Sequence, residues 1–243
     1  MENFSCLYCN SSFQELLPFG FDFPVLQKNK VIGAGYRLCV CSGCYSTDRE
    51  RLLLLYLTEK SSEIFSTQNK IKLLHVAPEK NLSFVLSSQS NIEYIAGDKF
   101  PSLYNHYSHL EKCITLDITS LAYQDNIFDV IICNHVLEHI HDDITAMSEL
   151  HRILKPGGWA ILQVPISLVL EETYEDFSIT SPEEREKAFG QRDHVRIYSK
   201  DYLQRLESVG FRVSTHNPMK EKWTSNLSKY GINLLEDVIL GKK

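Results

Sequence analysis

Short apolar runs alternate with amphipathic segments along the chain from Ile71 to its end. Short apolar runs bounded by turn residues are typical of buried strands. Alternation of such strands with helical segments predicts a doubly wound α/β fold, in which helices cover both faces of a mostly parallel sheet. The expected strands are IKLLHVA, IEYIAGD, KCITLDI, FDVIICN, WAILQVPI, FRVSTHN and LEDVILGKK.

Three segments have helical patterns. Residues 46–60 read as a helix. Ser46 or Thr47 can cap it, and acidic residues stand in its first turn. Residues 199–211 read as a helix that ends at Gly210. Residues 143–158 are the clearest helix, which Pro156 and two glycines end. The apolar stripe of that helix consists of Ile144, Met147, Leu150, Ile153 and Leu154.

The pattern also divides the chain. Residues 1–45 are rich in Cys, Gly, Phe and Pro and show little helical periodicity, so we expect a small separate module there. Residues 46–69 read as a connecting helix and a polar linker, and residues 70–243 as the α/β domain. Within that domain, residues 167–198 are long, charged and weakly patterned, which is typical of a functional lid or insertion.

Composition narrows the function classes. The 243 residues carry 25 Lys and Arg against 31 Asp and Glu, a net charge of −6, which does not favour nucleic acid as a partner. No run of 18 apolar residues occurs, and the N-terminal residues lack the pattern of a signal peptide. We therefore expect a cytoplasmic protein, with no membrane partner, whose seven cysteines are thiols or metal ligands. The sequence does not indicate an oligomeric state.

Four of the cysteines form two C-x-x-C pairs, Cys6 with Cys9 and Cys41 with Cys44. Two such pairs supply a tetrahedral site of four thiolates, which predicts a structural zinc ion in a zinc-ribbon-like module. Cys39 is a spare that could replace one ligand. Unliganded thiols are the alternative. A redox pair fits less well because neither pair opens a helix after a strand.

Acidic residues follow two of the expected strands. In a doubly wound sheet, ligands bind at the carboxyl ends of the strands, near the point where the strand order reverses. Asp98 is placed to accept both hydroxyls of a ribose, and Asp117 to meet an adenine amino group, with Ile118 stacked on the ring. Asp is also a frequent turn former, which is the alternative for each.

Two longer stretches resemble a known family. DITSLAYQDNIFDVIICNHVLEHI, from Asp117, and HRILKPGGWAILQVP, from His151, look like the centre of the class I (seven-strand, Rossmann-like) S-adenosylmethionine-dependent methyltransferases. The cysteine module and the run HVAPE resemble a bacterial subgroup of these enzymes. The resemblance implies a seven-stranded sheet whose last strand is antiparallel, and S-adenosylmethionine as cofactor. The cofactor-binding residues that it implies are His75, Ala77, Glu79, Asp98, Asp117, Ile118 and Asn134.

The first loop departs from the family's pattern. It reads HVAPEKN from His75, whereas the family usually has a glycine-rich loop there. Without glycine, fewer conformations with positive φ are available, so the methionine end of the cofactor must be held differently. Glu79 could accept the ammonium group of the cofactor. The alternative is a degenerate site that binds nothing.

Histidines supply the candidate catalytic groups. His135, Glu138 and His139 spell H-x-x-E-H, a signature of zinc peptidases that here stands in the wrong context, directly after a strand. On a helix, His135 and His139 would share one face and could share a metal; otherwise they line the cofactor cleft. His135, His139 and His194 are the general-base candidates for methyl transfer. Asp193 could orient His194.

Two arginines flank His194, and they leave two interpretations of this run open. Arg192 and Arg196 could clamp an anionic group of the substrate. The alternative is a salt-bridged loop that fixes the lid to the body of the domain.

These features favour a methyltransferase that acts on a small molecule or a sugar-containing (glycan-type) metabolite. RNA methylation is the second hypothesis, because cysteine modules precede some methyltransferase domains that act on rRNA, but the acidic net charge disfavours it. A non-catalytic binding protein with a degenerate cofactor site is the third.

Overall fold

The computed structural model describes residues 3–243. Its main feature is a seven-stranded sheet with the order β14-β15-β10-β9-β6-β7-β8. Neighbouring pairs β6–β7, β7–β8 and β9–β10 are parallel, and β15 is antiparallel to β10. The predicted α/β fold with an antiparallel last strand is thereby confirmed. The strands are β6 (Ile71–Val76), β7 (Ile92–Asp98), β8 (Cys113–Thr115), β9 (Phe128–Cys133), β10 (Leu154–Ile161), β14 (Arg212–His216) and β15 (Val238–Lys242).

By its internal contacts the chain divides into two compact units. The first comprises residues 1–19, 37–116 and 215–238, and the second comprises residues 20–36, 117–214 and 239–243. The boundaries predicted from the sequence (1–45, 46–69 and 70–243) stay a prediction. Among the described residues, no helix is long and apolar enough to cross a membrane.

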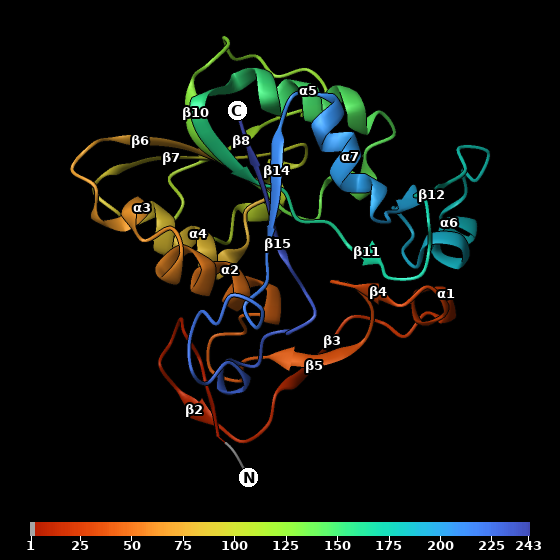
Figure 1. Ribbon diagram of the computed structural model, residues 1–243, viewed down its shortest axis with the longest axis horizontal. Helices are drawn as coiled ribbons and strands as arrows, with labels where there is room; N and C mark the ends of the chain where they lie inside the picture. The colour runs from red at the N-terminus through yellow and green to blue at the C-terminus, as the bar shows by residue number, and fades with distance from the viewer. Residues whose placement is uncertain (1–2) are drawn as a thin grey trace. The chain divides into compact units, whose positions relative to one another are not determined.

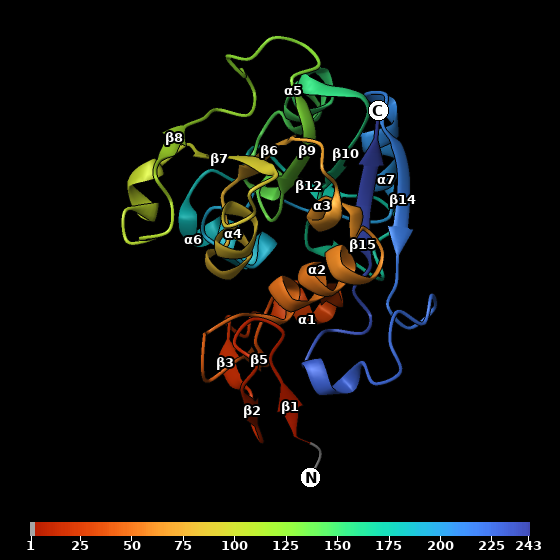
Figure 2. The same ribbon diagram turned by 90° about the vertical axis from the view of Figure 1, so that its left-hand side faces the viewer.

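The first unit contains two small two-stranded sheets and three strands of the seven-stranded sheet (Figure 1). Strands β6, β7 and β8 lie side by side, with α4 packed against β7 (Figure 2). Strand β1 pairs with β2, and β3 with β5, both antiparallel. The other elements of the unit are β1 (Phe4–Ser5), β2 (Ser12–Phe13), β3 (Leu17–Phe19), β5 (Arg37–Val40), α2 (Asp48–Glu59), α3 (Glu63–Ser66), α4 (Lys80–Ser87) and the 3-10 turns Pro101–Tyr104 and Ser228–Tyr230.

Helix α2 is the apolar centre of the first unit. Thr47 caps it and exchanges hydrogen bonds with Glu50 in a capping box, so the predicted helix start is confirmed. Every residue from Leu52 to Leu57 is buried, which means that the helix is covered on all sides. Arg51 is also fully buried in this helix, with its guanidinium on backbone carbonyls.

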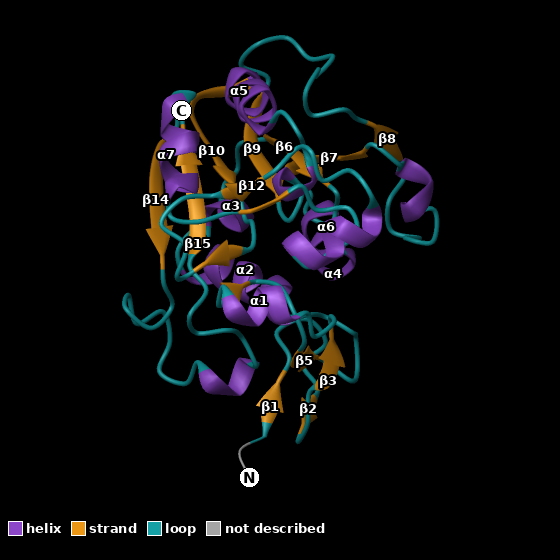
Figure 3. Ribbon diagram, turned by 90° about the vertical axis from the view of Figure 1, so that its right-hand side faces the viewer, coloured by secondary structure: helices purple, strands orange, loops and turns teal. Residues whose placement is uncertain are grey.

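The second unit holds β9, β10 and the helices α5 and α7, which pack against one another (Figure 3). Helix α1 lies against α6. Strand β4 precedes residues 37–116 of the first unit along the chain and strand β11 follows them, and these two strands pair in the second unit. The remaining elements are α1 (Pro24–Lys28), β4 (Val31–Ile32), the 3-10 turn Leu137–His139, α5 (Asp143–Ile153), β11 (Ile166–Ser167), β12 (Tyr174–Glu175), α6 (Pro182–Phe189), β13 (Arg196–Ile197) and α7 (Asp201–Ser208).

Two helix ends differ from expectation. Helix α5 ends at Ile153, because Leu154 is already extended and pairs with Phe128 of β9. Pro156 and the two glycines instead form an irregularity within β10, where Gly157 has φ +80°. Helix α7 ends at Ser208. Gly210 follows with φ +107°, and a Cβ there would meet the ring of His151, which is why a glycine closes this turn.

The predicted lid, residues 167–198, contains secondary structure of its own. It contains the antiparallel strand pair β12–β13, and helix α6 lies between these two strands along the chain. Arg196, fully buried, pairs with Glu175 at 2.8 Å across the two strands and with Asp143 of α5 at 3.4 Å. A salt bridge of 2.8 Å between Arg205 of α7 and Glu175 also holds β12.

Candidate functional site

The loop after β6 turns without glycine. Ala77 adopts φ +49°, a left-handed conformation that costs an L-residue about 1–2 kcal/mol. Its amide donates to the carbonyl of Gly97 at 2.9 Å, so the loop stays joined to the end of β7. An alanine, whose side chain is a single methyl group, therefore takes the left-handed conformation that glycine adopts most readily.

His75, buried near the end of β6, pairs with Glu79, a partly buried residue of this loop. His75 Nε2 lies 2.7 Å from Glu79 Oε2, and His75 Nδ1 lies 2.8 Å from the hydroxyl of Tyr94. Burial alone would raise the pKa of Glu79, but the hydrogen bond from His75 outweighs it and the pKa is lowered. The carboxylate is therefore anionic at neutral pH, with one oxygen on His75. Such a group suits an ammonium ligand.

Asp98 ends β7, as expected. Its Oδ1 accepts from the amide of Phe100 at 2.6 Å and its Oδ2 accepts from the hydroxyl of Tyr104 at 3.0 Å. Burial and the negative charge of Asp98 raise the pKa of Tyr104, which keeps the phenol protonated as a donor. A carboxylate offers about four lone-pair positions, so Asp98 retains acceptor capacity for ribose hydroxyls.

The next three predicted cofactor residues have different surroundings. Asp117 is exposed, and its Oδ1 accepts from the amide and the hydroxyl of Thr119, which is the turn-forming alternative raised from the sequence. Ile118 and Asn134 are both 3% exposed. Their proposed contacts with an adenine stay predictions.

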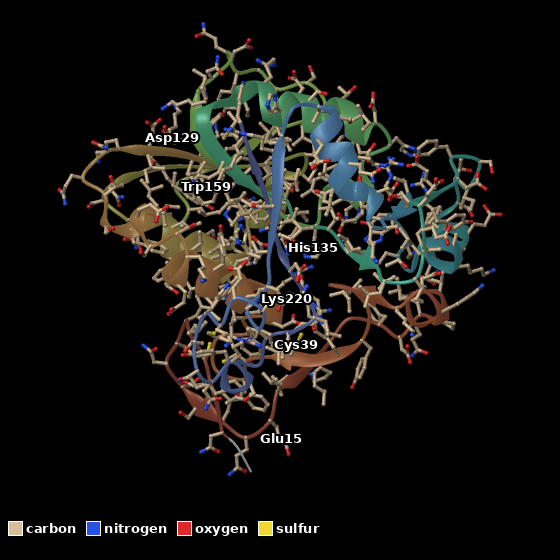
Figure 4. All side chains as sticks on the ribbon, in the orientation of Figure 1. Glu15, Cys39, Asp129, His135, Trp159 and Lys220 are labelled. Carbon is tan, nitrogen blue, oxygen red and sulfur yellow. The ribbon has the colours of Figure 1, made fainter. Side chains whose placement is uncertain are left out.

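The segment after β9 is not the helix expected for H-x-x-E-H. His135 has φ +54°, and its amide donates to the carbonyl of Gln163 at 2.8 Å. Only Leu137 to His139 form a 3-10 turn. This long-range bond and the left-handed residue replace the helical turn, so His135 and His139 do not share a helix face. Figure 4 labels His135, two residues beyond β9, and Asp129, near the strand's start.

Glu138, His139 and His194 come together in the second unit. Each offers one donor atom within 4.8 Å of the others. The rings of His139 and His194 meet edge to face with centroids 4.6 Å apart. His139 Nδ1 lies 3.3 Å from a carboxylate oxygen of Asp193, and the amide of Val195 donates to the carbonyl of Glu138 at 3.0 Å. Asp193 thus contacts His139, whereas the sequence had suggested that it could orient His194.

Charge is arranged unevenly over this cluster. Burial lowers the pKa of His194 to about 4, so this imidazole is neutral near pH 7. Burial opposes ionisation of Glu138, but the hydrogen bond with His135 and nearby histidine charges lower its pKa to about 2. Burial would lower the pKa of His139, yet the hydrogen bond with Asp193 outweighs it and the pKa is raised. The cluster therefore pairs a carboxylate with one neutral imidazole and one basic imidazole.

The arginines beside His194 are already engaged. Arg192 pairs with Glu183 of α6, and Arg196 is buried on Glu175 and on the carbonyls of Leu137 and Ile140. These contacts fit the alternative raised from the sequence, a salt-bridged loop that fixes the lid residues to the rest of their unit, better than a clamp for an anionic substrate.

The four predicted zinc ligands converge in the first unit. Cys6, Cys9, Cys41 and Cys44 each offer a sulfur within 4.8 Å of the others. The sulfurs of Cys6 and Cys44 are 3.5 Å apart, and those of Cys9 and Cys41 are 3.7 Å apart. Tetrahedral zinc with bonds of about 2.3 Å requires sulfurs about 3.8 Å apart, so the cluster fits this ion.

Cys39, the spare thiol labelled in Figure 4, is buried on β5 and lies outside the group of four. Burial raises its pKa to about 11. Its position outside the cluster makes it a poor substitute for one of the four ligands.

Two tyrosines that contact the predicted cofactor-binding residues were not identified from the sequence. Tyr94 lies in the middle of β7 and meets His75, and Tyr104 lies in a 3-10 turn and meets Asp98. Neither residue stands in a motif or at a strand end. Only the pairing of β6 with β7 and the fold of the turn create these contacts, so no local signal could have indicated them.

Comparison with known proteins agrees with this geometry. A family profile described as "Methyltransferase domain" matches residues 86–162. The crystal structure of a SAM dependent methyltransferase from Archaeoglobus fulgidus aligns over 80% of this chain and 94% of that chain, with a TM-score of 0.51 and 14% identity. The fold is that of a methyltransferase.

Sequence relatives match shorter stretches. An uncharacterized protein of Methanocaldococcus jannaschii is 38% identical over 80 residues, which are 32% of this chain and 35% of that protein. The demethylmenaquinone methyltransferase of Staphylococcus carnosus is 26% identical over 137 residues, 56% of this chain and 46% of that enzyme. The chain thus matches less than half the length of each of these relatives.

Proposed function

We propose that the chain is an S-adenosylmethionine-dependent methyltransferase that acts on a small molecule or a sugar-containing metabolite. The observation that carries this proposal is the methyltransferase profile over residues 86–162, which falls on strands arranged as in the methyltransferase fold. In chain order the sheet reads 3-2-1-4-5-7-6, so the strand order reverses at β6, where ligands of doubly wound sheets bind.

The cofactor residues follow from this reversal. Asp98 accepts the ribose hydroxyls, and Glu79 accepts the ammonium group. The pairing of Val76 with Gly97 supports both assignments, because it brings the carboxyl ends of β6 and β7 to one edge. Asp117 contacts the amino group of the adenine, and Ile118 stacks on the adenine ring. The remaining residues assigned to this site are His75, Ala77 and Asn134.

The chemistry requires an acceptor atom to attack the methyl group in line with the departing sulfur. Positioning supplies much of the rate of such a step, and an oxygen nucleophile also needs a base. His135, His139 and His194 are the proposed catalytic residues. The low pKa of His194, about 4, leaves its imidazole neutral at pH 7 and able to accept a hydrogen bond from the acceptor group.

The names of the relatives support a small-molecule acceptor. Several are demethylmenaquinone methyltransferases, and one, from Idiomarina loihiensis, is a ubiquinone/menaquinone biosynthesis C-methyltransferase. RNA methylation remains the second candidate function, carried only by the cysteine cluster; retention on RNA that weakens steeply with salt would favour it.

We also assign a structural zinc ion to Cys6, Cys9, Cys41 and Cys44. Four protein ligands close the coordination shell, so the ion would contribute to folding rather than to catalysis. The sulfur spacing supports this assignment.

Calorimetric titration of the full chain with S-adenosylmethionine tests the proposed function. We expect one site per chain. Asp98→Asn should bind about tenfold more weakly, equivalent to about 1.4 kcal/mol, because it loses charge-assisted hydrogen bonds to the ribose. Asp125→Asn, a surface carboxylate paired with Arg152, is the matched control and should bind as the wild type does. No heat and no thermal shift with the cofactor would refute the proposal.

A further inference from the structure

Two of the proposed catalytic histidines, His139 and His194, belong with Glu138 to a set of metal-binding donors in the second unit. Glu138 and His139 come from the turn after β9, and His194 comes from the far end of the lid residues. Their donor atoms lie within 4.8 Å of one another, although 55 residues separate His139 from His194 along the chain. One carboxylate and two imidazoles in this arrangement are a ligand set for a transition metal.

One donor of this set lacks a partner. Glu138 is 2% exposed, and its Oε2 has no hydrogen-bond partner among the described residues. Leaving a buried acceptor unsatisfied costs about 1–3 kcal/mol, and more when the group is charged. The other oxygen lies 3.5 Å from His135 Nδ1. A cation beside Oε2 would provide the missing interaction.

The surroundings also fit a metal site. Asp193 lies 3.3 Å from His139 Nδ1, and an ion bound through the second ring nitrogen would leave this contact in place. Metal-binding histidines commonly present their other nitrogen to a carboxylate in this way. The hydrogen bond from the amide of Val195 to the carbonyl of Glu138 holds the two ligand-bearing segments together.

We propose that Glu138, His139 and His194 bind a divalent transition-metal ion, such as Zn²⁺, Fe²⁺ or Mn²⁺, at a site distinct from the four cysteines. The two imidazoles select against Ca²⁺ and Mg²⁺, which prefer oxygen ligands. Three protein ligands leave coordination positions open, unlike the closed cysteine cluster. A bound ion would lower the pKa of a coordinated hydroxyl or water. Metal binding here does not depend on the proposed methyl transfer.

Metal analysis of the full chain tests this site. Protein is loaded with Co²⁺, dialysed and measured for ions per chain and for absorption. We expect Glu138→Gln and His139→Gln each to hold one ion fewer than the wild type. His139 is 28% exposed in its side chain, so its substitution should leave the fold intact even if that of Glu138 does not. His141→Gln, two residues further along and exposed, is the matched control and should retain the wild-type content.

The cysteine cluster provides a separate signal. Cobalt bound to thiolates has a sulfur-to-metal charge-transfer absorption that cobalt bound to histidine and carboxylate lacks. Cys9→Ser should lose this absorption, whereas His139→Gln should keep it and lose only the weaker bands of the second ion. Equal metal content in wild type, Glu138→Gln and His139→Gln would overturn the inference. Calorimetry with S-adenosylmethionine is independent of this result, so the two proposals fail separately.

Discussion

The side chain of Arg51 is fully buried, and its substitution directly tests the fold around the cysteine cluster. Its guanidinium donates to four backbone carbonyls: Ser46 at 2.5 Å, Cys39 and Tyr230 at 2.7 Å, and Gly231 at 2.8 Å. Arg51 therefore ties the cysteine-bearing segments to the C-terminal loop of the first unit. We predict that Arg51→Met, which keeps much of the side chain's volume, destabilises the protein strongly.

The magnitude follows from the four contacts. Hydrogen bonds to a charged group are worth about 1.5–3 kcal/mol each, which sets an upper limit of about 6–12 kcal/mol. Removing the charge also removes the several kcal/mol that its burial costs. Relaxation and water entry reduce the net effect further, and single substitutions rarely exceed about 4–5 kcal/mol. We therefore expect Arg51→Met to lower the free energy of unfolding by about 3–4 kcal/mol.

Urea denaturation at pH 7, with zinc present, measures this change. Lys60→Met is the matched control, because Lys60 forms only a partly exposed ion pair with Glu221 at 3.7 Å, worth about 0–1 kcal/mol. If Arg51→Met unfolds within 1 kcal/mol of the wild type, the argument that the four carbonyls depend on Arg51 is wrong.

Three further predictions concern zinc, pH and the cofactor loop. Cys9→Ser should lose the zinc ion and lower the melting temperature, while Cys113→Ser, outside the cluster, should keep the ion; equal metal content would contradict the zinc assignment. Burial opposes ionisation of Glu175, but Arg205 and Arg196 lower its pKa, so it stabilises the fold above the unfolded pKa of about 4.3 and stops doing so as pH falls through its lower folded pKa. Glu175→Gln should thus be less stable than the wild type at pH 7 and approach it below pH 4 in denaturation curves, whereas a constant difference would refute the linkage. Ala77→Gly should raise the free energy of unfolding by about 0.5 kcal/mol, since relief of the left-handed strain exceeds the entropic cost of glycine; a loss of stability would show that Ala77 is not strained.

Elements governed by local rules could be predicted from the sequence. Six strands of the sheet lie within the expected runs, because apolar runs between turn residues bury themselves in a sheet; β10 overlaps its expected run but begins at Leu154, within the segment expected to be helical. The start of α2 follows from Thr47 and Glu50 alone. The four cysteines converge as their spacing predicted, since two C-x-x-C pairs supply the four thiolates of one tetrahedral site.

Features set by long-range contacts could not be predicted in this way. Helix α5 stops at Ile153 rather than at Pro156, because Leu154 pairs with β9. The H-x-x-E-H segment is not helical, because the amide of His135 bonds Gln163 in a distant part of the chain. The meeting of Glu138 with His194 likewise depends on how the lid residues return to the turn after β9. No periodicity within either segment indicates that contact.

The central claim is that the glycine-free loop after β6 serves a methyltransferase as a cofactor site. A crystal structure of the full chain with S-adenosylmethionine tests it most directly. We predict that the ribose hydroxyls lie within hydrogen-bond distance of the Asp98 carboxylate and that the ammonium group lies on Glu79. Cofactor bound elsewhere on the chain, or crystals grown with saturating cofactor that contain none, would contradict the account.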